Sequence, residues 1–274
     1  MIVFILKESI VNKLIFLASA AYLISGLLLW LRTKSHHIQL PKNIILVLAG
    51  IATSIHGIFL WGTLLDTQGI QIGLGMSLSL AGWLSALLII ISSLSKPVEI
   101  LGIFIFPIAM LSLWLPAWLP PPHPTDFSIG IHVLTSLTAY TLLGLAAAQA
   151  LLILVQERRL KQKQWQGLLG NFPPLIDMER THVEWLMVGF FMLTLALVTG
   201  ALYVDNLFAQ HLAHKTVFTL LSWLLVATLL VGRWRFGWRG QKAAKLSLIG
   251  YGLLVIGFAG SQFVLEVLIT HPAT

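Results

Sequence analysis

Histidine is the residue type here whose chemistry stands out, because the chain has no cysteine and only ten acidic residues among 274. Of nine histidines, His56, His132, His211 and His214 lie inside or at the start of long apolar stretches. His211 and His214 are three residues apart, so on a helix they share one face. Neutral imidazole is a common ligand of haem iron and other transition metals. A single such histidine is equally well explained as a hydrogen-bonded packing residue.

The remaining histidines lie in more polar surroundings, which makes them poorer candidates for a site. His36 and His37 follow Lys34, His271 is close to the end of the sequence, and His182 lies between Arg180 and Glu184. We expect these four to be solvated. His123 lies in a proline-rich loop.

The elements that must position these histidines are membrane-spanning helices. Hydrophobic residues make up 57% of the chain, charged residues 10%, and the mean hydropathy is +0.89, whereas soluble domains carry about 25% charged residues. This composition excludes soluble folds and disorder, and the absence of cysteine excludes a disulfide framework. The sequence predicts an all-α, polytopic membrane bundle forming a single domain over residues 1–274. Its eight expected spans are about 14–31, 43–62, 71–94, 98–116, 129–155, 184–204, 214–232 and 246–269.

The basic residues predict which side of the membrane each loop occupies. Loops after the first, third, fifth and seventh spans hold 14 of the 17 lysines and arginines. Because cytoplasmic loops are enriched in these residues, we expect the odd-numbered loops in the cytoplasm and both termini outside it. The localisation expected is the inner (plasma) membrane. The net charge of +7 then reflects topology, and we expect no nucleic-acid partner.

With that topology, the four histidines of the apolar stretches all lie toward the outer leaflet. Two opposed imidazoles suit the two axial positions of a haem, whose porphyrin supplies the other four donors. We expect His132 and His214 to be these iron ligands, with His56 at the floor of a common cavity. His211 is the rival ligand, and Lys215 or Gln210 is expected to bind a propionate.

Several segments of the chain resemble the cytochrome c assembly family. The resemblance covers roughly residues 129–250 and is weaker through the first four spans. It is carried by HVLTSLTAYTLLGLAAAQALLILVQERRLK, FPPLIDMERTHVEWLMVGFFMLTLALVTGAL and HKTVFTLLSWLLVATLLVGRWRFGWRGQKAA. Because the loop YVDNLFAQHLA contains no tryptophan, the chain is most similar to the HemX-like branch, which lacks the tryptophan-rich motif.

The resemblance implies that haem is handled at the outer membrane–water interface. In the family, a histidine that opens the helix before the haem motif is an outer axial ligand, and His132 matches it. His56 resembles a buried histidine of an early helix that holds a deeper haem in some relatives. His214 falls where relatives end their tryptophan-rich segment.

Two functions from different classes follow as hypotheses. The first is a haem-binding membrane protein of cytochrome c assembly, with a non-covalent b-type haem and membrane lipid, an apocytochrome or another membrane protein as partners. The second is a non-haem accessory subunit that docks a partner protein through its basic cytoplasmic loops. The sequence has no Ser/His/Asp arrangement typical of nucleophilic catalysis, so no enzymatic activity is expected.

Overall fold

The computed structural model describes residues 2–34, 41–66, 69–162, 173–203 and 210–263. It is built from helices, as expected, and seven helical segments within these residues are long and apolar enough to span a membrane. The long helices are α1 (Ile2–Lys34), α2 (Lys42–Leu64), α3 (Leu74–Ser95), α4 (Gly102–Trp118), α5 (Phe127–Lys161), α6 (Leu175–Tyr203), α7 (Gln210–Phe236) and α8 (Gly240–Phe263). A 3₁₀ turn, η1 (Glu99–Leu101), leads directly into α4.

The helix ends differ from the expected spans mainly where polar residues continue a helix. α5 runs on to Lys161 through the basic residues Arg158 and Arg159, and α6 begins at Leu175 rather than at residue 184. Pro174 immediately precedes α6, at the boundary where proline's fixed φ is tolerated. α8 covers the first part of the last expected span, 246–269, and the rest lies outside the described residues.

The chain divides into two compact units. Unit 1 comprises Met1–Gly130 with Trp165–Asp177, and unit 2 comprises Ile131–Gln164 with Met178–Thr274. The expectation of a single membrane domain stays a prediction.

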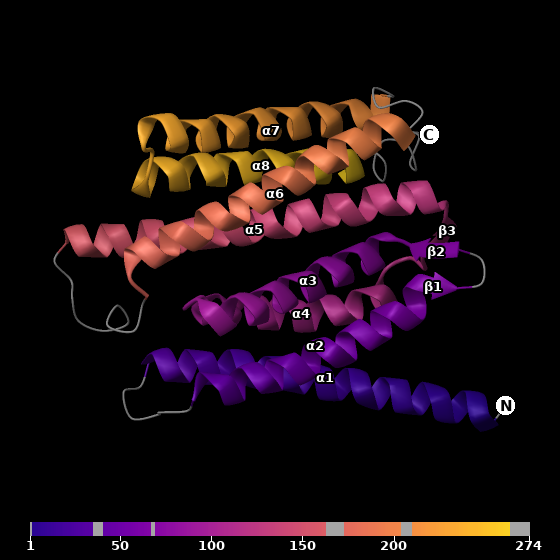
Figure 1. Ribbon diagram of the computed structural model, residues 1–274. Coiled ribbons are helices and arrows are strands. Elements are labelled where there is room, and N and C mark those ends of the chain that lie inside the picture. The colour runs from indigo at the N-terminus through magenta and orange to yellow at the C-terminus, as the bar shows by residue number, and fades with distance from the viewer. Residues whose placement is uncertain (1, 35–40, 67–68, 163–172, 204–209, 264–274) are drawn as a thin grey trace, which may run out of the picture. The chain divides into compact units, whose positions relative to one another are not determined.

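Small residues let the helices of unit 1, α1 to α4, approach one another closely (Figure 1). Ala18, Ala49, Ala86 and Ala109 are fully buried, one from each helix. Gly82 of α3 lies so close to Ser112 of α4 that a Cβ would overlap the serine side chain. Because lipid is as apolar as leucine, association of such helices depends on close packing rather than on hydrophobic burial. Large apolar side chains accordingly point outward, among them Phe16, Val47, Ile58, Trp61 and Leu94.

A small antiparallel sheet at one end of unit 1 was not predicted. It pairs β1 (Leu65–Asp66), β2 (Gly69–Ile72) and β3 (His123–Thr125) in that order. Ile70 faces Thr125 and Ile72 faces His123. The third span therefore starts at Leu74 rather than at residue 71, because residues 69–72 form a strand.

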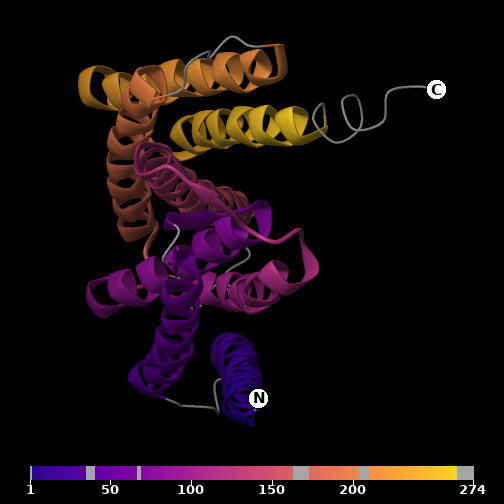
Figure 2. The same cartoon turned by 90° about the vertical axis from the view of Figure 1, so that its right-hand side faces the viewer.

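In unit 2, α7 and α8 form a helical hairpin whose members lie side by side in Figure 1 and in the turned view of Figure 2. Gly237 and Gly240, both with positive φ, make the short connection. The Ser222 hydroxyl donates to the Gly250 carbonyl across this hairpin at 2.8 Å. Gly189 of α6 lies against Leu143 of α5, and Gly144 of α5 lies against Tyr251 of α8, so glycines again mark close approaches.

Candidate functional site

The first candidate ligand, His132, is oriented by hydrogen bonds to α6. Its Nδ1 lies 3.2 Å from the Thr199 hydroxyl oxygen. That hydroxyl in turn donates to the carbonyl oxygens of Leu195 and Ala196, at 2.9 and 3.2 Å. The imidazole also hydrogen-bonds the backbone carbonyl of Ala196. Two contacts with α6 therefore fix the orientation of the His132 ring.

The His132 side chain lines a cavity of about 210 Å³ in unit 2. The start of α5, the end of α6 and the start of α7 contribute its walls. Its lining residues are His132, Ser136, Tyr140, Leu193, Ala196, Leu197, Gly200, Lys215, Thr216 and Thr219. Gly200 makes room for the imidazole, because a Cβ at that position would lie 3.0 Å from His132 Cε1. The cavity is thus a mainly apolar space whose lining includes one imidazole and one cationic side chain.

On α7 it is Lys215, not His214, that lines this cavity. His214 is exposed. Consecutive residues of a helix point about 100° apart, so the helix face that presents Lys215 turns His214 away. Gln210 and His211 belong to the first turn of α7, and their side chains lie outside the described residues.

His56 lies in unit 1, where both of its ring nitrogens are hydrogen-bonded. The side chain is fully buried, at 0% exposure. The Tyr22 hydroxyl donates to Thr53 at 3.1 Å, so it accepts from His56 Nδ1 at 3.4 Å. Ser79 lies 2.9 Å from Nε2 and donates to it. A ligand role for His56 therefore requires the loss of one of these bonds.

The structure brings His132 and Lys215 to one cavity and places His56 in a separate network of the other unit. A common site for all four histidines stays a prediction. Among the described residues, no group of three or more histidine, cysteine or acidic side chains could hold a bare metal ion.

Comparison with known proteins identifies the family. The family model described as "Cytochrome C assembly protein" matches residues 72–269, most of the chain and parts of both units. The chain belongs to the cytochrome c assembly family.

Relatives within this family extend over most of the sequence. The inner membrane protein YpjD of Escherichia coli (strain K12) is 28% identical over 236 residues, covering 83% of this chain and 88% of YpjD. The cytochrome c biogenesis protein CcsA of Prochlorococcus marinus (strain AS9601) is 26% identical over 199 residues, covering 64% and 63%. An uncharacterised 28.8 kDa protein of Azospirillum brasilense is 35% identical over 143 residues, covering 52% and 53%. No solved structure matches the chain.

Its apolar helices and its likeness to YpjD make this member of the cytochrome c assembly family a multi-pass inner membrane protein. The family implies haem, and the residues around His132 fit that group. In iron-ligating histidines the second ring nitrogen is typically hydrogen-bonded to an oxygen, and His132 Nδ1 lies 3.2 Å from the Thr199 hydroxyl oxygen. The cavity is smaller than the ~300–1,000 Å³ of pockets that enclose drug-sized ligands. A porphyrin would therefore enter only if α5, α6 and α7 move apart.

Sequence reasoning missed His182, which is buried at 2% exposure instead of solvated. It lies within α6, and its Nε2 has no hydrogen-bond partner among the described residues. The pattern that could have revealed it is the apolar stripe of this helix. Its buried face repeats every three or four residues through Met178, His182, Trp185, Gly189, Leu193, Ala196 and Gly200.

Proposed function

We propose that this protein binds haem in the cavity between α5, α6 and α7, with His132 as an iron ligand. The observation that carries the proposal is that the imidazole of His132, oriented by its hydrogen bond to Thr199, lines the same cavity as the cationic Lys215. Haem bound there would be available for delivery to apocytochromes, as an assembly protein requires. No reaction of its own is assigned to the protein.

The cationic side chain of the cavity has a role in this proposal. Lys215 lines the same space as His132, and a lysine ammonium pairs with a carboxylate such as a haem propionate. Leu193, Ala196 and Leu197 supply apolar contact for the porphyrin face. The haem is therefore a non-covalent b-type group, in keeping with the absence of cysteine.

The second axial ligand comes from α7 in this proposal. His214 neighbours Lys215 in the chain, and His211 lies one turn earlier. A turn of α7 about its own axis, accompanying the separation of the helices, would bring His214 toward the cavity. We place the site at the outer membrane surface, which rests on the charge asymmetry of the loops, and assign the chain to the HemX-like branch.

Titration of haem into the purified protein, followed by its visible spectrum, tests this function. Wild-type protein should give a Soret band with the low-spin features of histidine ligation. His132→Ala should abolish them, and His214→Ala and His211→Ala should identify the second ligand. His56→Ala should leave haem affinity unchanged, because its nitrogens are bonded within unit 1.

His36→Ala serves as the matched control, since that histidine lies outside the predicted spans. A wild-type protein that stays colourless and takes up no added haem overturns the proposal and favours the accessory-subunit function. An unchanged titration for His132→Ala would show that haem binds elsewhere.

A further inference from the structure

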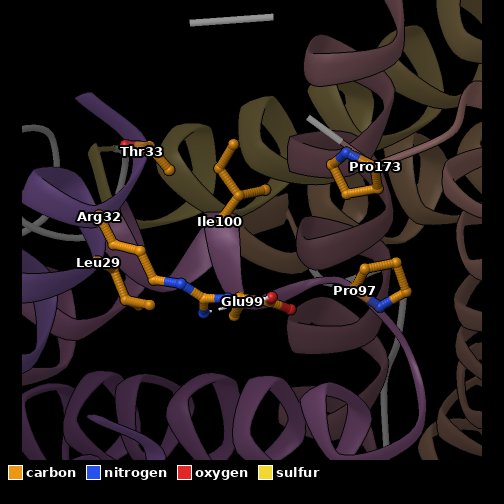
Figure 3. A pocket seen from close by; sticks show the side chains of 7 residues that line it. All are labelled: Leu29, Arg32, Thr33, Pro97, Glu99, Ile100 and Pro173. Atoms are coloured by element: carbon orange, nitrogen blue, oxygen red, sulfur yellow. Dashed lines mark ion pairs between the residues drawn. The ribbon is translucent and has the colours of Figure 1, made fainter. Parts of the chain in front are cut away.

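A second polar cavity, of about 130 Å³, lies in unit 1 at the end of α1. Leu29, Arg32 and Thr33 of α1 form one wall, and Pro97, Glu99, Ile100 and Pro173 complete it. Figure 3 shows the Arg32 guanidinium directed toward the Glu99 carboxylate, with Pro97 and Pro173 at the other side of the space. The volume holds several waters, or one polar group of similar size.

The ion pair in this cavity is incomplete. Arg32 Nη1 lies 3.8 Å from Glu99 Oε1, which is too long for a hydrogen bond. Within the part of the chain that the structure describes, Arg32 Nη1 and Glu99 Oε2 are buried and have no hydrogen-bond partner. Buried charged atoms without partners are strongly unfavourable. Neither atom is accessible to a water molecule as the two side chains lie, so a further molecule would reach this donor and this acceptor only after Arg32 and Glu99 rotate apart.

The cavity lies at the ends of the apolar helix segments, where lipid headgroups are expected. The apolar segment of α1 ends at Lys34, that of α3 ends at Ser95, and the next span begins at Glu99. The ammonium of Lys34 lies 4.8 Å from the centre of the Trp30 ring, a pairing typical of the membrane interface. Outside the cavity, Leu94 is exposed, as a side chain in contact with lipid would be.

We propose that this cavity binds the phosphoethanolamine headgroup of a membrane lipid. Its phosphate oxygen would accept from Arg32 Nη1, and its primary ammonium would donate to Glu99 Oε2. A purely anionic headgroup meets the repulsion of Glu99, and a purely cationic group meets that of Arg32. A group with both charges a short distance apart satisfies both buried atoms.

The ammonium must also carry N–H groups. Phosphatidylcholine has the same two charges, but its quaternary nitrogen has no proton to donate. The proposal therefore predicts that the site prefers phosphatidylethanolamine to phosphatidylcholine, which differ only in the methylation of the headgroup nitrogen. This site is independent of the haem site in unit 2.

The test compares lipid binding by the full-length protein in nanodiscs of defined composition, with retained lipids counted by native mass spectrometry. Nanodiscs contain equal amounts of phosphatidylethanolamine, phosphatidylcholine and phosphatidylglycerol. We expect wild-type protein to retain phosphatidylethanolamine roughly tenfold more than either competitor, as one charge-assisted hydrogen bond provides. Equal retention of phosphatidylethanolamine and phosphatidylcholine overturns the proposal, and this comparison needs no variant.

Variants assign the preference to the two side chains. Glu99→Gln should abolish the advantage over phosphatidylcholine, and Arg32→Gln should reduce retention of both zwitterionic lipids. Glu184→Gln is the matched control, because it disrupts an exposed ion pair with Arg180 of 3.3 Å outside this cavity. If Glu99→Gln keeps the full preference, the cavity is not the site.

A further experiment distinguishes binding of a lipid headgroup from binding of free phosphoethanolamine. Free phosphoethanolamine at millimolar concentration should fail to displace the lipid, since the acyl chains hold it beside the apolar helices. If the free compound displaces the lipid from wild-type protein but not from Glu99→Gln, the site recognises phosphoethanolamine and takes it from solution. Displacement that is unaffected by Glu99→Gln would contradict the site.

Discussion

At the scale of single residues, hydrogen-bond partners separate histidines that burial alone would group together. His56 has both nitrogens engaged, by Tyr22 and Ser79. His132 has Nδ1 bonded to Thr199, and its side chain lines a cavity. A metal ligand needs a ring that faces a space and a ring nitrogen that is held in orientation. Of these two histidines, His132 is the one whose side chain lines a described cavity.

Thr199→Val should weaken haem binding without removing the ligand. Valine has the same shape as threonine but cannot form a hydrogen bond with Nδ1 of His132, so the imidazole loses a contact that holds its orientation. We expect affinity to fall by roughly 10-fold, the lower end of typical effects of such outer partners. Titration followed at the Soret band measures it.

Thr228→Val is the matched control, because that exposed hydroxyl of α7 bonds only the Leu224 carbonyl of its own helix. An equal loss in both variants would mean that the Thr199 effect reflects general destabilisation.

At the scale of the elements, glycines determine how closely helices pack in unit 1. A Cβ at Gly75 of α3 would lie 2.7 Å from the Leu115 carbonyl oxygen and 3.0 Å from Pro116 Cα, both backbone atoms of α4. Backbone cannot rotate away as a side chain can. A Cβ at Gly50 of α2, by contrast, would meet nothing within 4 Å. The same substitution therefore has opposite consequences at the two positions.

Gly75→Ala should lower the free energy of unfolding by about 1–3 kcal/mol, because α3 and α4 must separate to admit the methyl group. Gly50→Ala should leave it unchanged or raise it by about 0.5–1 kcal/mol, since alanine restricts the unfolded chain. Thermal unfolding in detergent, monitored by circular dichroism, compares the two. A Gly75→Ala midpoint at or above that of Gly50→Ala would contradict this account of the packing.

The start of α8 depends on a side chain from α6. Glu179 Oε1 accepts the backbone N–H of Gly240 at 3.0 Å, so a carboxylate caps the N-terminal end of α8. Glu179→Ala should destabilise this end by about 0.5–2 kcal/mol. Hydrogen exchange should become faster at the first amides of α8. Glu184→Ala on the same helix should leave those amides unaffected; equal rates in both variants would exclude the cap.

At the scale of the whole molecule, the family match extends over residues 72–269 and so includes elements of both compact units. His132 and Lys215 lie near the starts of α5 and α7, which follow even-numbered loops. In unit 1, the cavity of Arg32 and Glu99 lies beside odd-numbered loops, those after the first and third spans. Their assignment to the outer and cytoplasmic surfaces depends on the orientation that the loop charges predict.

Reporter fusions test this orientation. With 14 of 17 basic residues in the odd-numbered loops, a reporter inserted after Gln164 should be active in the cytoplasm, and one fused after Thr274 should be active outside it. Alkaline phosphatase and green fluorescent protein give complementary readouts. The reverse pattern would place the His132 cavity on the cytoplasmic side and exclude an outer haem site.

The sequence by itself determined the helical architecture, because no other backbone arrangement of these long apolar runs satisfies its hydrogen bonds in lipid. Seven of the eight expected spans correspond to helices long and apolar enough to cross a membrane. Local hydropathy could not predict the sheet, since Ile70 pairs with Thr125 across 54 intervening residues. It also misplaced His182, because the start of α6 depends on Pro174 and on packing rather than on hydropathy.

The tertiary structure alone decided which polar residues meet. Thr199 is 67 residues from His132, and no local pattern links them. The choice of Lys215 over His214 depends on the rotation of α7 about its axis, which changes the facing residue by about 100° per position. An apolar run predicts which residues lie within the membrane, because transfer into lipid depends on each side chain separately. Contact between side chains of different helices depends on packing, which no single stretch of sequence contains.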